Sequence, residues 1–393
     1  MRESRSKSAS IAVLIVCEIA VLSLWFSAAA VLPDMAREAE LEPGDLAWSS
    51  TAVQLGFGFG AIGYAVLSLA DRHDPRHVFL ISALIGAAAN LAIIAAPIGG
   101  WQAIALRAAT GAAMAGVYPV GMKIAAGWGR DDRALLMGLL IAALTIGSGS
   151  PHLISLMGGA DWRLTIWAST GLAVIGGVGI LWAGLGPFHA RAPRLDFGAV
   201  ALVWRDPRIR LAVAGYLGHM WELYAFWAWV GVFAGLSFGL AGAEGAQDFA
   251  KLTAFIAIIL GGIASVPAGW LADRIGRAKV AMACLIGSGG AALASAAVFG
   301  GPVWLMFAVL ILWGTALVPD SALYSTMVAD AAPPERAGSL LTFQTALGFL
   351  LTAITVQAMP WFAALTGWQW ALAAMALGPA VGIRAMQLLM RLR

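Results

Sequence analysis

The sequence contains few charged residues. Asp, Glu, Lys and Arg make up only 11% of its 393 residues, whereas hydrophobic residues make up 61%. A water-soluble globule of this length cannot bury so much apolar surface, so most of the chain must be surrounded by lipid. The net charge is only +3, which excludes the broad basic surface that nucleic-acid binding needs.

Cysteine and histidine are also scarce. The two cysteines, Cys17 and Cys284, lie inside apolar runs and match no disulfide or zinc spacing. The five histidines are scattered, unlike the clustered ligands of a membrane enzyme, and no Gly-x-x-x-x-Gly-Lys-Ser/Thr motif indicates ATP binding. We therefore expect a protein that is not an enzyme and that holds no metal and no cofactor.

Long apolar runs occupy the rest of the chain. Runs of about 20 residues, the length that crosses a bilayer as a helix, follow one another with short polar breaks. The first run is too long for a secretory signal. We predict an all-α, polytopic membrane protein with twelve spans, at 10–33, 47–70, 77–97, 101–126, 133–158, 162–187, 210–236, 249–272, 279–299, 303–329, 337–362 and 367–390.

The basic residues predict the orientation of these spans. If the N-terminus is cytoplasmic, 20 of the 24 Lys and Arg residues fall on the cytoplasmic side. Only Arg37, Arg163 and Lys251 fall outside, and Arg107 lies within a span. Because basic loops stay in the cytoplasm, we expect a multi-pass protein of the cell (inner or plasma) membrane with both termini inside.

The two halves of the chain repeat each other. Leu-Ala-Asp-Arg occurs at 69–72 and again at 271–274. In the first and seventh spans a Glu precedes a Trp by seven residues, two helical turns on one face, at Glu18 and Trp25 and at Glu222 and Trp229. We predict an N-terminal six-helix bundle (1–188), a Pro- and Arg-rich cytoplasmic linker (189–209) and a C-terminal six-helix bundle (210–393).

The repeated loop resembles a signature of the major facilitator superfamily (MFS), Gly-x-Leu-Ala-Asp-Arg-x-Gly-Arg between neighbouring spans. The second half matches it closely through Gly269, Asp273, Arg274, Gly276 and Arg277. The first half matches in part, through Asp71, Arg72 and Arg76, whereas Leu67, Asp74 and Pro75 depart from the pattern.

The fourth span carries Arg107-Ala-Ala-Thr-Gly111, similar to another signature of this superfamily. The resemblance implies two six-helix bundles that alternate access to a central site. It also implies that the two loops act as gates, because an Asp beside Arg at a helix end can bond the neighbouring half in one conformation only.

Four charged side chains lie well inside the predicted spans: Glu18, Arg107, Glu222 and Asp320. A charge at that depth needs a partner or a watery cavity. We predict that Arg107 neutralises Glu18, either as a proton switch or anion clamp or as a structural ion pair.

Glu222 is the strongest candidate for proton coupling, because a carboxyl group in a low-dielectric site binds a proton more readily than one in water. His219 lies one turn earlier on the same face. The alternatives for this pair are a structural interhelix bond and a helical His-Glu metal site.

Two prolines indicate hinges, at Tyr118-Pro119 and at Pro319-Asp320, where the ring breaks the helical hydrogen-bond ladder. Trp25 and Trp229 could offer aromatic walls to an organic solute or could simply pack. His152, after Pro151, is expected to be solvated near the outer mouth.

Together these features predict a secondary transporter that moves a small, organic solute by alternating access, coupled to protons or another ion. Its expected partners are the solute, the coupling ion and the lipid bilayer, and we expect a monomer. The alternatives are a membrane sensor with a transporter fold and, among transporters, a carrier of an inorganic anion or a metal.

Overall fold

The structure is a computed structural model that describes residues 6–41, 46–129, 133–158, 161–188 and 196–392. Within these ranges all regular structure is helical and no strand is present. Apolar helices satisfy their backbone hydrogen bonds internally, which a chain inside a bilayer requires. The predicted all-α architecture is therefore confirmed.

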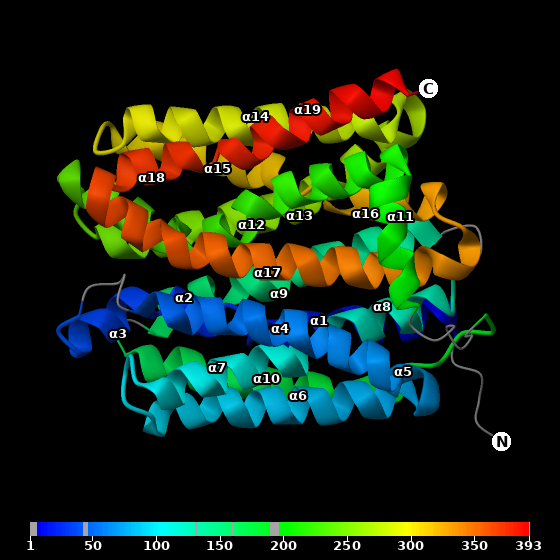
Figure 1. Cartoon of the computed structure of the whole chain (residues 1–393). Coiled ribbons are helices and arrows are strands. Elements are labelled where there is room, and N and C mark those ends of the chain that lie inside the picture. Colours follow the sequence, from blue (N-terminus) through cyan, green and yellow to red (C-terminus); the bar gives the residue numbers. More distant parts are fainter. Residues whose placement is uncertain (1–5, 42–45, 130–132, 159–160, 189–195, 393) are drawn as a thin grey trace.

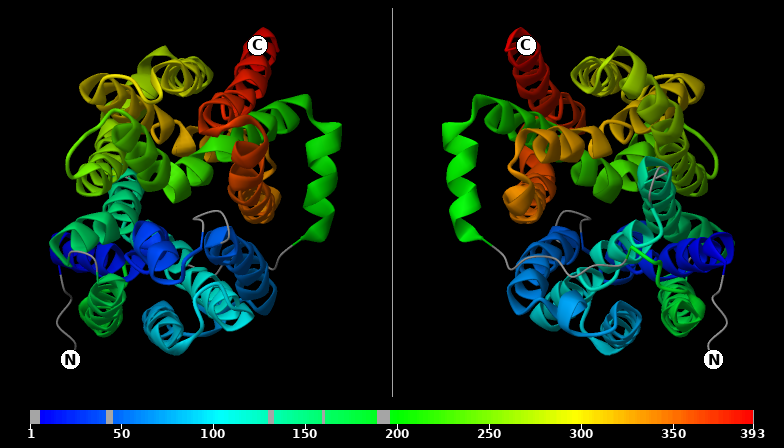
Figure 2. Two further views of the ribbon diagram at one scale, coloured as in Figure 1. Left: turned by 90° about the vertical axis from the view of Figure 1, so that its left-hand side faces the viewer. Right: turned by 90° about the vertical axis from the view of Figure 1, so that its right-hand side faces the viewer.

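The helices form two layers, one from each half of the chain, and both views along the bundle in Figure 2 keep the layers apart. The first half forms the lower layer of Figure 1. Its elements are α1 (Lys7–Leu22), α2 (Ser27–Ala30), α3 (Leu32–Glu38), α4 (Ala47–Leu67), α5 (Leu69–Arg72), α6 (Pro75–Ala92), η2 (Ile93–Ala95), α7 (Trp101–Met114), α8 (Tyr118–Ala126), α9 (Arg133–Gly158), α10 (Trp162–Gly179) and η3 (Ile180–Trp182).

The second half forms the upper layer, and a short connecting helix, α11, runs between the layers at one side (Figure 2). The predicted linker 189–209 is described only from residue 196 onward. The elements are η4 (Phe197–Val200), α11 (Ala201–Arg205), α12 (Pro207–Leu240), α13 (Ala246–Ile275), α14 (Arg277–Val298), α15 (Val303–Leu317), α16 (Ser321–Ala331), α17 (Pro334–Thr366), α18 (Trp368–Ala374) and α19 (Leu377–Arg391).

Eleven helices within the described ranges are long and apolar enough to cross a membrane. They correspond to the second to twelfth predicted spans. The first predicted span, 10–33, is divided instead: α1 is only 16 residues long, and turns at 23–26 separate it from α2. The first span is thus a broken helix.

Local sequence explains where several helices begin. The Asp74-Pro75 and Asp206-Pro207 pairs start α6 and α12, and each Asp accepts a hydrogen bond from a backbone N–H of the first turn. Proline suits this position because its missing N–H would be unpaired there anyway. Both helices start at the end of the bundle where α1 begins and α19 finishes, which we call the terminal end; the opposite end is the far end (Figure 1).

Two breaks occur at matching places in the two halves. α7 gives way to α8 across residues 115–117, and α15 gives way to α16 across residues 318–320. Pro119 lies in the first turn of α8, and Pro319 lies directly before Asp320, the N-cap residue of α16. The helix breaks that the two prolines predict are therefore present.

The halves meet along two pairs of helices, α4 with α17 and α9 with α13. Close packing in these pairs depends on small residues. Gly149 of α9 lies against Ile258, and Gly262 of α13 lies against Thr145. A side chain at Gly262 would collide with the Thr145 hydroxyl, so this contact tolerates only glycine without a shift of the helices.

Candidate functional site: the junction between the halves

Glu18 is a buried carboxylate without a hydrogen-bond partner. Its side chain is 0% exposed, and neither carboxylate oxygen is bonded to any described residue. Gly121 of α8 leaves room for it, since a Cβ at that position would collide with Oε1. The Tyr118 hydroxyl, one turn before Gly121, lies within electrostatic range of the carboxyl group. Such a group has no bonded partner among the described residues that would stabilise its charged form.

Arg107 does not pair with Glu18, so the predicted ion pair is wrong. Its guanidinium donates instead to backbone carbonyls, from Nη1 to Leu24 O at 3.1 Å, from Nη2 to Trp25 O at 2.5 Å and from Nε to Ser49 O at 3.4 Å. Two of these carbonyls belong to the turns that divide the first span. Arg107 therefore caps a helix break inside the membrane, where water is not available to do so.

Polar side chains complete this cap. Arg107 Nη1 also donates to Ser27 Oγ and Asn90 Oδ1, both at 3.3 Å, and the Ser27 hydroxyl donates to Asn90 Oδ1 at 2.7 Å. Ser23 and Ser27 each donate to a carbonyl three residues earlier, which competes with the helical ladder. The break thus forms without a proline or a glycine, which is why the sequence pattern did not reveal it.

Glu222 is as buried as Glu18 but is well bonded. Its Oε1 accepts from the Ser288 hydroxyl at 2.5 Å, and its Oε2 accepts from the Trp313 indole N–H at 3.2 Å. The donors come from α14 and α15, so the carboxylate joins three helices of the second half. This arrangement suits an interhelix bond at least as well as a mobile proton site.

His219 contacts Asp320 and not Glu222. Its Nδ1 lies 2.9 Å from Asp320 Oδ1, a close but poorly aligned contact, and its Nε2 lies 2.9 Å from Ser321 Oγ. Tyr324 donates to the other Asp320 oxygen at 2.7 Å. The network ties α12 to the break between α15 and α16. Among the described residues, no group of three His, Cys, Asp or Glu side chains is placed to hold a metal ion.

Aromatic rings fill the centre of the junction. Trp25 and Phe57 come from the first half, and Tyr224 and Phe349 from the second. The ring centroids of Phe57 and Phe349 are 4.2 Å apart, those of Trp25 and Phe57 4.7 Å, and those of Tyr224 and Phe349 4.9 Å. We call these four rings the aromatic plug. Rings from both halves interlock here, so the plug must come apart whenever the halves separate.

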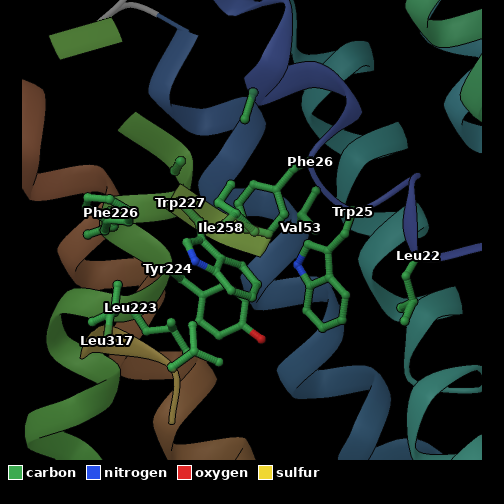
Figure 3. Packing of buried hydrophobic residues seen from close by; sticks show 14 of the residues in the cluster. Leu22, Trp25, Phe26, Val53, Leu223, Tyr224, Phe226, Trp227, Ile258 and Leu317 are labelled. Carbon is green, nitrogen blue, oxygen red and sulfur yellow. The ribbon is translucent and has the colours of Figure 1, made fainter. Parts of the chain in front are cut away.

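Two further rings extend the plug, as Figure 3 shows. Phe26 stacks on Tyr224 at 6.0 Å and meets Trp227 edge-on at 5.6 Å. The Tyr224 hydroxyl points away from both of these rings (Figure 3). The indole N–H groups of Trp25 and Trp227 are buried and have no partner among the described residues.

Trp229 differs from its repeat partner Trp25. Its indole N–H donates to Val356 O at 3.0 Å, and its ring packs on Trp368 at 5.6 Å. Both contacts lie within the second half. Trp229 therefore serves packing in this conformation, whereas Trp25 faces the junction.

An ion pair that the sequence did not predict joins the halves at the far end. Lys251 of α13 donates to Asp34 of α3 at 2.9 Å, and both side chains are nearly fully buried. Nearby, Thr51 of α4 donates to Gln357 of α17 at 3.0 Å. The sequence predicted only that Lys251 is external. It did not reveal Asp34 as the partner, because the two residues are separated by 217 positions.

The gate loop of the first half is held within its own bundle. Arg76 forms a two-point contact with Asp74, at 2.6 and 3.0 Å, and also donates to the carbonyl of Ala183 at 3.2 Å. The hydrogen bond from Arg76 lowers the pKa of Asp74 below its usual value. Arg72 is exposed, and the Asp71 side chain lies outside the described structure.

The gate loop of the second half is also held within its own bundle. Arg277 pairs with Asp330 of α16, and the Arg274 guanidinium lies 3.6 Å from the Trp270 ring centroid. Gly276 has a φ of +101°, which allows the sharp turn from α13 to α14.

A cavity of about 400 Å³ lies beside this loop, lined by Asp273, Arg208 and Arg277 among others, all from the second half. Gly269 faces open space. Among the side chains of the two loops that the structure describes, the bonds found all lie within their own half in this conformation.

Residues 14–262 and 245–393 match the sequence model of the Major Facilitator Superfamily. The chain belongs to this superfamily. A comparison with curated protein sequences finds no match.

Solved structures of other superfamily transporters share the fold. The nucleoside transporter NupG superposes with a TM-score of 0.73 at 18% identity, covering 97% of this chain and 99% of that one. A point mutant of NupG gives 0.75 at 14% identity over the same shares. A bacterial homolog of the human lysosomal transporter Spinster, described as inward-facing and unoccupied, gives 0.73 at 12% identity, covering 100% and 98%. At these identities the likeness shows the fold alone.

Superfamily membership makes the protein a secondary transporter.

The burial of side chains along the helices shows which end of the bundle is closed. On α4 most residues from Ala47 to Gly58 are buried, whereas none of the following residues up to Leu67 is. On α13 burial is likewise concentrated before Gly262. The halves therefore pack together from the far end to the middle of the bundle and separate toward the terminal end.

Proposed function

We propose that this superfamily member is a proton-coupled transporter of a small organic solute and that Glu18 carries the proton. One observation carries the proposal: a fully buried carboxyl group beside the junction has no bonded partner. A buried group that is neither paired nor hydrogen-bonded favours its neutral form and can exchange a proton when the surroundings become wet. Glu222 is the second candidate, although its two hydrogen bonds favour a fixed state.

The orientation follows from the basic residues. With the terminal end in the cytoplasm, the protein lies in the cell (inner or plasma) membrane and is open to the inside in this conformation. The bundles 1–188 and 210–393 would rock against each other, which takes the aromatic plug apart when the far end opens, and the linker 189–209 would join them. The Asp34–Lys251 pair would break when the far end opens.

The two loops are proposed as the matching inner gate. Asp273, Arg274 and Arg277, and on the other side Asp71, Arg72 and Arg76, would bond across the halves when the terminal end closes. Gly269 and Gly276 would give the second loop the close approach that this needs. Breaks at Tyr118 and Asp320 would let the terminal ends of their spans bend.

The solute would bind between the halves beside the plug. Trp25 and Tyr224 offer flat faces, and Tyr118 and Glu18 offer polar groups from the first half. Such a surface suits an organic solute better than a bare inorganic ion. Because two of the similar structures are of a nucleoside transporter, nucleosides head the list of compounds to test.

The test is pH recording in proteoliposomes that contain the purified protein, with neutral, anionic and cationic organic solutes added one at a time. We expect a solute-dependent proton flux in the wild type and at least a 100-fold loss in Glu18→Gln, while exchange of solute across the membrane survives. Glu222→Gln is the matched control, since it removes a buried carboxylate in the other half. Coupling that survives in Glu18→Gln and disappears in Glu222→Gln would assign the proton to Glu222.

Silence of the wild type across the panel, with the fold intact, would contradict proton coupling. It would favour uniport, another coupling ion or a sensor that binds without transporting.

A further inference from the structure

Helix α9 presents a row of buried polar side chains that have no partner. Ser148, His152 and Ser155 lie at spacings of four and three residues, so they share one face. All three are at most 1% exposed, and the two hydroxyls and both imidazole nitrogens are unbonded among the described residues. The expectation that His152 is solvated near the outer mouth is therefore wrong.

The central member of this row, His152, lies against the other half of the protein. A Cβ at Gly231 of α12 would lie 3.6 Å from the His152 ring, so the missing side chain leaves the imidazole directly against α12. Trp227 lies one turn before Gly231 on the same helix and has its own buried, unbonded indole N–H. His152 is also within electrostatic range of Lys251. His152 thus lies near the Asp34–Lys251 pair and against the helix whose Trp227 extends the aromatic plug.

Unbonded polar groups in a buried site are unfavourable and need an explanation. One or two would be unremarkable, but this surface combines two hydroxyls, an imidazole and an indole N–H. Hydroxyl and imidazole groups both donate and accept hydrogen bonds, whereas the indole only donates. The nearby charges of Lys251 and Asp34 neutralise each other. The surface therefore matches an uncharged group that can both donate and accept.

We infer that Ser148, His152 and Ser155, with Trp227, form an outer subsite that binds the hydroxyl groups of a neutral solute whose flat ring stacks on the aromatic plug. The subsite is closed against Gly231 in this conformation and becomes accessible when the far end opens. It rests on the proposed transport function and narrows the solute to uncharged, hydroxylated ring compounds.

Binding to the purified full-length protein in detergent tests this inference without any proton gradient. The probes are uridine, which has a flat ring and hydroxyls, uracil, which lacks the hydroxyls, and benzoate, which is charged. Thermal unfolding at increasing ligand concentration gives each dissociation constant, because a ligand of the native state raises the melting temperature. We expect uridine to bind more tightly than uracil and benzoate not to bind.

In His152→Ala we expect the dissociation constant of uridine to rise about 10-fold and in Ser148→Ala about 3-fold, with a smaller change for uracil. Ser169→Ala is the matched control, because Ser169 is also buried with an unbonded hydroxyl but lies on α10. If His152→Ala does not unfold cooperatively, His152→Gln and the two serine variants decide the question. Unchanged uridine binding in these variants, or an equal loss for uracil, would overturn the subsite.

The two proposals can fail separately. A wild type that ignores uridine but drives proton flux with a charged solute would refute the subsite and leave proton-coupled transport in place. Uridine binding that depends on His152 without any proton flux would support the subsite and refute proton-coupled transport.

Discussion

Glu18 and Glu222 occupy corresponding places in a duplicated chain, yet their surroundings differ. Glu18 lies in a short helix of 16 residues that ends in turns. Its carboxyl group has no bonded partner among the described residues. Glu222 sits near the middle of a continuous helix of 34 residues, and two side chains from neighbouring helices donate to it. The same residue type therefore lies in a loosely held site in one half and in a fixed network in the other.

The difference originates in how each half handles backbone polar groups. In the first half, Arg107 bonds the free carbonyls of the broken span, so it is not available to Glu18. In the second half, α12 is continuous and needs no such cap. A repeat in sequence thus predicts equal positions but not equal roles, because the role depends on which donors remain free nearby.

The largest effect is expected from removing the cap. Arg107→Met should lower the free energy of unfolding by about 4 kcal/mol, because several buried carbonyls and Asn90 lose their donor at once. Thermal unfolding in detergent measures it. Arg163→Met, an exposed arginine in the same half, serves as control and should change little. A fully stable Arg107→Met protein would show that the break does not depend on the cap.

The contact between the halves is the next way to sharpen the comparison. Lys251→Met removes the buried partner of Asp34 and leaves it only the exposed Arg37, 3.3 Å away, so it should destabilise the closed far end by about 2 kcal/mol. In a background with Cys17 and Cys284 replaced, a cysteine introduced at Thr51 should react faster with a membrane-impermeant maleimide. Adding Asp34→Asn should restore part of the protection. Equal labelling in all variants would mean that the pair does not hold this end shut.

Stability should also separate the two carboxylates. Glu222→Gln disturbs the two hydrogen bonds that hold the buried carboxyl group and should destabilise the protein by about 1.5 kcal/mol, whereas Glu18→Gln loses no hydrogen bond and should change stability little. Paired melting curves of the two variants measure the difference. A larger loss of stability in Glu18→Gln than in Glu222→Gln would show that Glu18, and not Glu222, is the more firmly held carboxyl group.

The smallest effect concerns Glu38 of α3, which bonds Arg163 at 2.6 Å and the Trp162 indole at 2.7 Å. The hydrogen bond from Arg163, then that from Trp162, lowers the pKa of Glu38 to about 2. Since this pKa lies below that of the unfolded chain, the contribution of the Glu38 charge to stability is complete only above about pH 5 and disappears as the pH falls toward 2.

Glu38→Gln should therefore lower the melting temperature by the same amount at pH 7 and at pH 5, because Glu38 is charged at both. The decrease should be slight, because solvent screens the exposed pair. Melting curves at both pH values check this. A difference that disappears by pH 5 would contradict the lowered pKa.

Much of the molecule could be predicted before its structure was known. The apolar runs predicted the helices to within a few residues at many ends. Pro119, which follows Tyr118, and Pro319, which precedes Asp320, marked two real breaks. The loop at 271–274 predicted the superfamily correctly. The pairing of Arg107 with Glu18 and the solvation of His152 were wrong, because both depend on which side chains meet from distant helices.

Composition by itself determined that the chain is helical and spans the membrane, since lipid allows few other solutions for so apolar a sequence. The recurring Leu-Ala-Asp-Arg and Glu–Trp patterns indicated that it is built as a repeat. They also identified the buried charges, because a charge within an apolar run stands out. Only the tertiary structure decided the partners of those charges: the cap that occupies Arg107, the network around Glu222 and the ion pair between Asp34 and Lys251. These partners are set by hydrogen-bond geometry between helices far apart in sequence, which no local pattern encodes.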